Sequence, residues 1–165
     1  MINNIELKNI EIENLNEKDF VNSVSNKVED NYEELENTER ETIVKTRIGQ
    51  SLFKNKLLKQ SCECKICGLD EEALLIASHI KPWRVSNNNE RLDKNNGFIF
   101  SPTIDKLFDI GLITFENNKS LLVSKSLDKS NIISIGIEPK KVYEKLPLEN
   151  RMQYLEYHRN FIFLD

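Results

Sequence analysis

The fold is decided by residues 74–111, which read LLIASHIKPWRVSNNNERLDKNNGFIFSPTIDKLFDIG. A short apolar run ends at His79, one of two histidines in the chain, and a second apolar run follows Asn96. Ser101-Pro102 then opens a segment typical of a helix, because proline is favoured in the first helical turn. The stretch therefore predicts strand, loop, strand and helix, with polar side chains where the elements join.

This arrangement resembles the HNH endonucleases, also called ββα-metal or His-Me finger nucleases. In that family a histidine ends the first strand, an asparagine begins the second, and a further polar residue lies on the following helix. In this chain those positions are held by His79, Asn96 and Asp105. The segments ASHIKPW and NGFIFSPTIDKLFDIGLI are similar to a subgroup among bacterial restriction and defence nucleases, in which Asp stands at the third position. The resemblance extends from Arg47 to the C-terminus.

The resemblance implies an α+β fold, in which a ββα-metal (HNH) nuclease core carries flanking helices and an extra β-hairpin. We expect residues 1–37 to form an acidic N-terminal segment, a short strand plus an amphipathic helix, and residues 38–165 to form the nuclease domain. Thr38-x-x-Glu41 has the form of a capping box and predicts a helix to about Lys59. Later elements are predicted from apolar patterning and turn residues: a hairpin over 112–115 and 121–124, a short strand over 132–137, and a helix over 149–160.

Hydrolysis of a phosphodiester needs an activated water, neutralisation of phosphate charge and help for the departing oxygen. By the resemblance, His79 is the general base, Asn96 fixes the loop between the strands, and Asp105 binds a divalent metal, Mg²⁺ or alternatively Mn²⁺ or Ni²⁺. Asp109 lies four residues after Asp105 on the same helical face, as a second metal ligand or as a structural carboxylate. Ser78 stands where many family members carry a metal ligand, which leaves the named ligand set incomplete.

The loop between the predicted strands carries cations that suit contact with a nucleic-acid backbone. Lys81, Arg84, Arg91 and Lys94 surround Trp83 in the sequence. In ββα nucleases this loop lies near the scissile phosphate, so basic residues there would hold the backbone without reading the base sequence. We interpret Trp83 as a packing residue, with contact to a base or sugar as the alternative.

Net charge at first argues against a nucleic-acid partner, because the chain of 165 residues has a formal charge of −4. Residues 1–45 carry 12 acidic and 5 basic side chains, a net charge of −7, whereas residues 46–165 carry 15 acidic and 18 basic, a net charge of +3. Phosphate binding depends on lysine and arginine. The mildly basic part therefore keeps DNA, in double-stranded form, as the expected partner.

The three cysteines, Cys62, Cys64 and Cys67, are clustered and do not form a disulfide framework. Cys64-x-x-Cys67 has the spacing of zinc ligands, but a tetrahedral site needs a second pair that this sequence lacks. We therefore predict reduced thiols rather than a structural Zn²⁺. The longest apolar run, residues 73–77, is too short for a membrane span, so we expect a cytoplasmic protein without a membrane partner. His158, in a predicted aromatic-rich helix, is interpreted as a packing residue.

The sequence thus predicts a metal-dependent endonuclease in restriction or anti-phage defence. Two alternatives stay open: a nucleic-acid-binding or assembly subunit with an incomplete nuclease site, and a nuclease effector or toxin that a partner regulates. In either case the N-terminal segment would join a second copy or another component of a defence system.

Overall fold

The computed structural model describes residues 37–165, so the strand and the helix predicted within residues 1–36 lie outside the described residues. The chain divides into two units between Ile48 and Gly49, and the packing considered below is that within residues 49–165. The boundary falls inside helix α2, Asn37–Leu58, which agrees with the helix predicted from residue 38. Side chains of residues 37–41 are not described, so the capping box stays a prediction.

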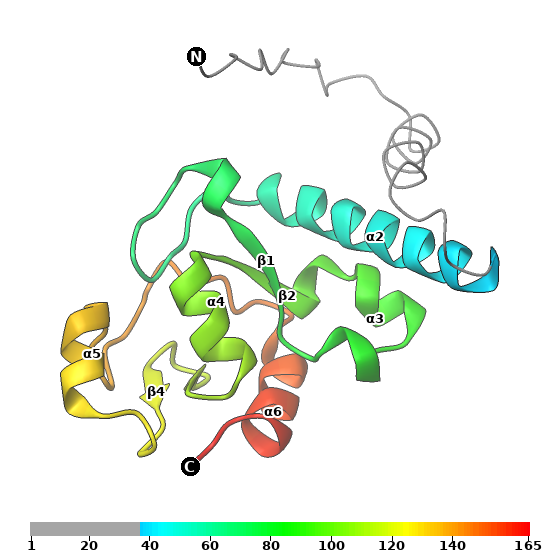
Figure 1. The fold of residues 1–165 in the computed structure, drawn as a ribbon. Helices are drawn as coiled ribbons and strands as arrows, with labels where there is room; N and C mark the ends of the chain where they lie inside the picture. The colour runs from blue at the N-terminus through cyan, green and yellow to red at the C-terminus, as the bar shows by residue number, and fades with distance from the viewer. Residues whose placement is uncertain (1–36) are drawn as a thin grey trace, which may run out of the picture. The chain divides into compact units, whose positions relative to one another are not determined.

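The predicted strand–loop–strand–helix order is present. Strand β1 spans Ile76–His79 and strand β2 spans Gly97–Phe100. They pair antiparallel, with Ile76 opposite Phe100 and His79 opposite Gly97. Helix α4, Pro102–Asp109, follows at once, and its proline lies in the first turn. Figure 1 shows this ββα unit with α4 packed along the hairpin, which confirms the predicted α+β class.

The two faces of the hairpin are buried by different helices, because successive side chains of a strand point to opposite faces. Gly97 faces α2: a Cβ at this position would collide with the Phe53 ring and lie 3.0 Å from Leu57. Phe98 faces the other way and packs edge-on against Phe108 of α4, with 6.0 Å between the ring centroids. The ββα unit is therefore held between the C-terminal part of α2 and α4.

The extra hairpin is also confirmed. Strands β3, Ile113–Phe115, and β4, Leu121–Val123, form a separate antiparallel sheet. Helix α6, Met152–Phe161, packs against β3. Aromatic rings from the first sheet, α4 and β3 meet in one core, whose largest fully buried members include Phe98, Phe100, Phe108 and Phe115.

The strand predicted over Ile132–Ile137 is wrong, because this segment lies mostly in helix α5, Lys129–Ile135. Asp128 precedes it as N-cap residue and Gly136 ends it in the left-handed conformation at φ 76°, which glycine adopts at little cost. Ile132 and Ile135 are three positions apart, hence on one helical side, and both pack against the core. Isoleucines fit a strand or a helix, and here the N-cap residue Asp128 and the terminating Gly136 favour the helix.

The loop between β1 and β2 is itself built from short helices. Helix α3, Asn88–Leu92, begins with a capping box in which Asn87 and Glu90 satisfy each other's backbone N–H groups. Three-residue 3-10 helices η3, Trp83–Val85, and η4, Lys94–Asn96, flank it, and η2, Glu72–Leu74, precedes β1. None of the helices in residues 37–165 has both the length and the apolar character of a membrane span.

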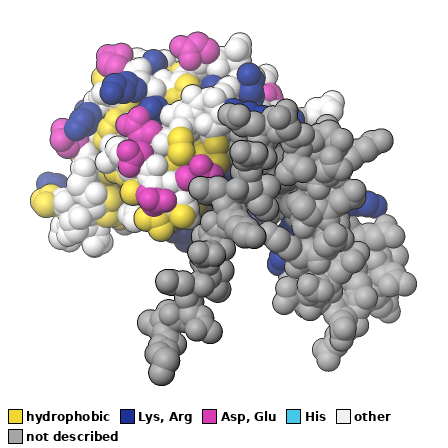
Figure 2. All heavy atoms as spheres, turned by 90° about the horizontal axis from the view of Figure 1, so that it is seen from above, with side chains coloured by type: hydrophobic (Ala, Val, Ile, Leu, Met, Phe, Trp, Pro, Cys, Tyr) yellow, Lys and Arg dark blue, Asp and Glu magenta, His cyan; other side chains and the backbone are white. Residues whose placement is uncertain are grey.

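Charged groups of both signs are interspersed on one face of the described residues. Figure 2 shows acidic, basic and apolar side chains mixed on the face that it presents. Net charge alone therefore does not locate a binding surface, and the cations have to be considered by their individual partners.

Candidate active site

His79 ends β1 with its imidazole held between two aromatic rings. The ring stacks on Phe53, with 3.7 Å between the centroids, and meets the Trp83 ring edge-on at 5.4 Å. Nε2 lies 3.0 Å from the Arg91 carbonyl oxygen. A carbonyl only accepts, so Nε2 carries the proton and Nδ1 of the neutral ring keeps its lone pair. Burial lowers the pKa of His79, although the bond to Arg91 acts in the opposite direction.

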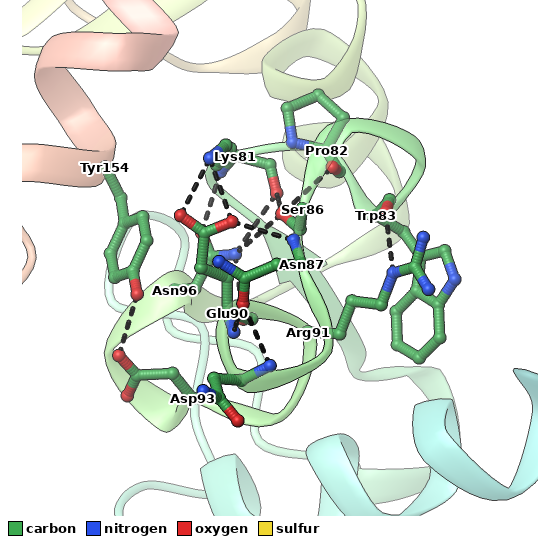
Figure 3. A network of polar contacts seen from close by, with 11 residues as sticks. Lys81, Pro82, Trp83, Ser86, Asn87, Glu90, Arg91, Asp93, Asn96 and Tyr154 are labelled. Atoms are coloured by element: carbon green, nitrogen blue, oxygen red, sulfur yellow. Dashed lines mark hydrogen bonds and ion pairs between the residues drawn. The ribbon is translucent and has the colours of Figure 1, made fainter.

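Asn96 joins the two ends of the loop that carries Arg91. Its side chain is completely buried. Oδ1 accepts from the Lys81 backbone N–H at 2.8 Å, and Nδ2 donates to the carbonyls of Lys81 at 3.2 Å and Glu90 at 3.0 Å. Figure 3 shows this amide at the centre of the polar network. Because the Arg91 carbonyl follows Glu90 directly, the bonds of Asn96 fix the segment that orients His79.

An ion pair reinforces the same loop. Lys81 Nζ lies 2.7 and 2.8 Å from the two carboxylate oxygens of Glu90. The Lys81 hydrogen bond, together with one from the Asn87 backbone, lowers the pKa of Glu90. Lys81 therefore stabilises the loop through its ion pair with Glu90.

The other predicted phosphate-binding cations differ in their surroundings. Arg91 Nε donates to the Trp83 carbonyl at 3.0 Å, and its guanidinium carbon lies 5.2 Å from the centre of the Trp83 ring. Arg84 and Lys94 are exposed. Of the four predicted cations, two hold the loop and two are turned to solvent.

The predicted metal ligands lie on the α4 side of β1. Asp105, in the first turn of α4, is half-buried. Burial raises the pKa of Asp105, the neighbouring charge of Asp109 acts in the same direction, and a hydrogen bond from Ser78 opposes both. The three side chains supply two carboxylates and a hydroxyl, and Mg²⁺ prefers oxygen ligands.

The donor set fits a hard divalent cation that keeps several water ligands. No group of three His, Cys, Asp or Glu side chains that could hold a metal occurs within residues 37–165. Mg²⁺ commonly binds one or two carboxylates and completes its shell with water and substrate phosphate oxygens. Asp105 and Asp109 stay the predicted protein ligands for such a site.

A groove lies beside the site. Alternation along β1 puts Ser78 and His79 on opposite faces of the strand. A hollow of about 620 Å³ is lined by Trp83 and Arg84 of the loop and by Asp109 of α4, whereas His79 and Asp105 are not among its lining residues. Trp83 contacts His79, and the charge of Asp109 acts on Asp105.

The position of Trp83 depends on Gly49 of α2. A Cβ at Gly49 would lie 2.7 Å from the six-membered ring of the indole, so a larger residue would displace it. This contact supports the packing interpretation of Trp83. The groove wall beside His79 is thus fixed by a glycine in the middle of a helix.

Two side chains of the C-terminal region, which the sequence did not single out, hold the start of β2. Tyr154 donates its hydroxyl to Asp93 at 2.9 Å. Arg151 donates to the carbonyls of Gly97 at 3.1 Å and Lys94 at 3.3 Å. The partners of Arg151 are 54 and 57 residues away in sequence, so no local pattern could have revealed them.

The remaining candidates lie in structural positions. The buried His158 is bonded through Nε2 to the Phe108 carbonyl and through Nδ1 to the Thr114 hydroxyl, both at 3.0 Å. Cys64 is buried, whereas Cys67 is exposed and its thiol lies 3.3 Å from the Ser101 hydroxyl. His158 is therefore a core residue, as the sequence interpretation held.

Comparison with known proteins agrees with this geometry. Residues 64–116 match the family model described as HNH endonuclease. The matched segment begins at Cys64 and contains β1, the loop, β2, α4 and β3. No curated protein matches the chain.

Proposed function

We propose, from the match of residues 64–116 to the HNH endonuclease family model, that the chain is a metal-dependent endonuclease that cleaves double-stranded DNA in restriction or anti-phage defence. The observation that carries the proposal is the state of His79. Its Nε2–H is bound to a fixed carbonyl, so a neutral ring offers Nδ1 as a base. The sequence similarity to restriction and defence nucleases supports the biological setting.

In this proposal His79 takes the proton from the attacking water. The lowered pKa keeps the imidazole neutral near neutral pH, which is the form that accepts a proton. As the ring becomes positive, the Arg91 carbonyl stabilises it by accepting the Nε2–H. Asn96 is a positioning residue, because its bonds to Lys81 and Glu90 hold that carbonyl in place.

Asp105 and Asp109 would hold the divalent cation, Mg²⁺ or alternatively Mn²⁺ or Ni²⁺. When bound there, the cation supplies neutralisation of phosphate charge and stabilisation of the departing oxygen. Ser78 keeps its hydrogen bond to Asp105 and so orients the carboxylate. Its neutral hydroxyl adds no third charge to the ligand set.

The DNA backbone would run along the groove beside Trp83. Arg84 lines this groove and is exposed, so its guanidinium is available for a phosphate. Lys94 is also exposed, but it lines a different hollow, beside β2. Contacts of this kind position a duplex without reading its sequence.

The decisive experiment is cleavage of supercoiled plasmid by the wild type, by His79→Ala and by Lys125→Ala, each with Mg²⁺, with Mn²⁺ and with EDTA. Lys125 is a suitable control because its side chain is 84% exposed. We expect the wild type and the control to nick plasmid only with metal, and His79→Ala to lose at least about a hundredfold in rate, as removal of a general base does. Equal cleavage by His79→Ala would refute the assignment.

A second function is favoured by one observation. Ser78 occupies the position of a metal ligand, is buried and is bonded to Asp105. A nucleic-acid-binding or assembly subunit with an incomplete nuclease site would bind duplex DNA and stay inactive with every metal. We also propose that residues 1–37 form a separate acidic segment for a second copy or a defence partner. Their net negative charge supports this proposal.

A further inference from the structure

A second hollow lies against the start of β2 and shares no lining residue with the groove that Trp83 and Arg84 line. It has a volume of about 570 Å³ and lies between the end of α2, β2 and residues 145–151. Four basic side chains line it, and only two acidic ones, Glu63 and Glu149, do so. The basic residues are Lys65, Lys94, Lys145 and Arg151.

Arg151 forms the inner wall and is 3% exposed. Its hydrogen bonds run to the carbonyls of Gly97, Lys94 and Glu149 and to the side-chain oxygen of Gln60. All four acceptors are neutral, and no carboxylate of residues 37–165 forms an ion pair with this guanidinium. The charges of Glu149 and Asp93 act on the guanidinium from a greater distance, so Arg151 builds the inner wall while the exposed Lys94 and Lys145 supply most of the free positive charge at the rim.

The lysines at the rim differ in how far they are already paired. Lys65 forms an ion pair with Glu63, which leaves three basic side chains, Lys94, Lys145 and Arg151, against one acidic side chain, Glu149. Lys94 and Lys145 donate no side-chain hydrogen bond and form no ion pair within residues 37–165. Lys94 comes from η4 and Lys145 from the segment before α6, so the two ammonium groups approach the hollow from different elements.

Backbone and amide groups add neutral donors to the same wall. The Gly97 carbonyl points away from β1, since it accepts from Arg151. In an antiparallel pair the N–H and C=O of one residue lie on the same side and alternate residues share it, so the Ile99 N–H also lies on this edge. Asn95 and Asn150 contribute side-chain amides to the lining.

We propose that this hollow is a binding site for phosphate groups. Convergent ammonium and guanidinium groups with backbone N–H donors are the features that bind phosphate oxygens. The volume lies in the usual range for small-ligand sites, about 300–1,000 Å³. The phosphates belong either to a nucleic-acid strand or to a free nucleotide. The strand case rests on the proposed function, because it places a second contact on the same duplex.

The site also lies next to the candidate catalytic loop. Lys94 and Gly97, whose carbonyls bind Arg151, stand on either side of Asn96. A phosphate held by Lys94 and Arg151 would tighten the chain segment from which Asn96 fixes the loop. Occupation of the hollow and the orientation of His79 are thereby connected through a short, continuous stretch of bonded residues.

The test is binding by the full chain in EDTA, which separates it from cleavage. Binding of pyrophosphate is measured by calorimetry, and binding of a labelled short duplex by fluorescence anisotropy. Both measurements are made on the wild type, on the double variant Lys94→Gln/Lys145→Gln and on the control Lys125→Gln. Both variants exchange exposed lysines for neutral side chains, so folding is retained, which thermal melting checks. We expect the double variant to bind about tenfold more weakly than the control and its salt slope for the duplex to fall by about two.

The two probes distinguish the sources of phosphate. Weaker binding of the duplex by the double variant, with or without pyrophosphate binding, supports a strand phosphate. Weaker binding of pyrophosphate with unchanged duplex binding supports a free nucleotide. If neither probe distinguishes the double variant from Lys125→Gln, the phosphate site is refuted. That result would leave the nuclease proposal intact, since it depends on His79→Ala in the plasmid assay.

Discussion

Replacement of Asn96 by aspartate tests the hydrogen bonds through which this side chain joins the two ends of the loop. The substitution keeps the size of the side chain and the oxygen that accepts from the Lys81 N–H. It replaces the amide nitrogen, which donates at 3.2 and 3.0 Å to the carbonyls of Lys81 and Glu90, with a second oxygen. Two hydrogen bonds are lost and two carbonyls face a like-charged oxygen at a fully buried position. At about 1 kcal/mol per bond plus the unsatisfied acceptors, we expect a loss of about 3 kcal/mol.

Urea unfolding at pH 8 and pH 5 measures this loss. Burial raises the pKa of a carboxyl, so the introduced carboxylate takes up a proton more readily in the folded than in the unfolded chain. The stability deficit of Asn96→Asp should therefore be smaller at pH 5 than at pH 8, because the protonated carboxyl can donate one of the lost bonds. Asn89→Asp is the matched control, since Asn89 is exposed on α3.

A near-normal stability of Asn96→Asp would contradict the role of this side chain in the loop. If Asn96→Asp unfolds within about 0.5 kcal/mol of the wild type at pH 8, as an inconsequential surface change does, then Asn96 does not hold the loop. Cleavage of plasmid provides the second readout. A variant that is folded under the assay conditions and still cuts more slowly than the wild type at the same pH would show that the orientation of the loop, rather than stability, limits the reaction.

Three further predictions concern the histidines and the carboxylates. Burial lowers the pKa of His158 to about 4 from 6.5, so the unfolded chain binds more protons between these values. The free energy of unfolding should accordingly fall as the pH is lowered from 6.5 to 4, by about 3 kcal/mol more in the wild type than in His158→Gln. If chemical denaturation shows the same dependence of this free energy on pH in both proteins, the prediction is contradicted. Because burial also lowers the pKa of His79, the cleavage rate should be half-maximal below pH 6.5 in a pH–rate profile, and a midpoint above pH 7 would exclude His79 as the base. Asp105→Asn should abolish Mg²⁺-dependent nicking, while fluorescence anisotropy in EDTA shows unchanged duplex binding. Retained nicking would show that residues other than Asp105 bind the metal.

Local patterning was sufficient for the ββα unit because each of its elements carries its own signal. The apolar run that ends at His79, the Asn96-Gly97 step and Ser101-Pro102 each mark a junction within a few residues. The segment 132–137 shows the limit of such patterns. Its isoleucines suit a strand or a helix equally, and the choice depends on the side that packs against the core and on Gly136, which ends the helix.

The site was predictable in its residue types but not in its three-dimensional arrangement. The separate faces of β1 that carry Ser78 and His79 follow from strand alternation, yet the position of Trp83 beside His79 depends on its packing against Gly49. The pairing of Lys81 with Glu90 requires the loop to close on itself. Arg151 reaches its partners only after the whole chain has folded around β2.

The dependence of β2 on Arg151 and Tyr154 has a consequence during protein synthesis. The family match ends at residue 116, but Asp93 and Gly97 receive their hydrogen bonds from residues made 35 or more positions after that end. At ~5–20 residues per second, translation takes roughly 2 to 7 s to cover that interval. For this time a nascent chain has the complete HNH sequence while the segment before β2 lacks its anchor. The loop that orients His79 therefore stays without this support until Arg151 and Tyr154 have been synthesised.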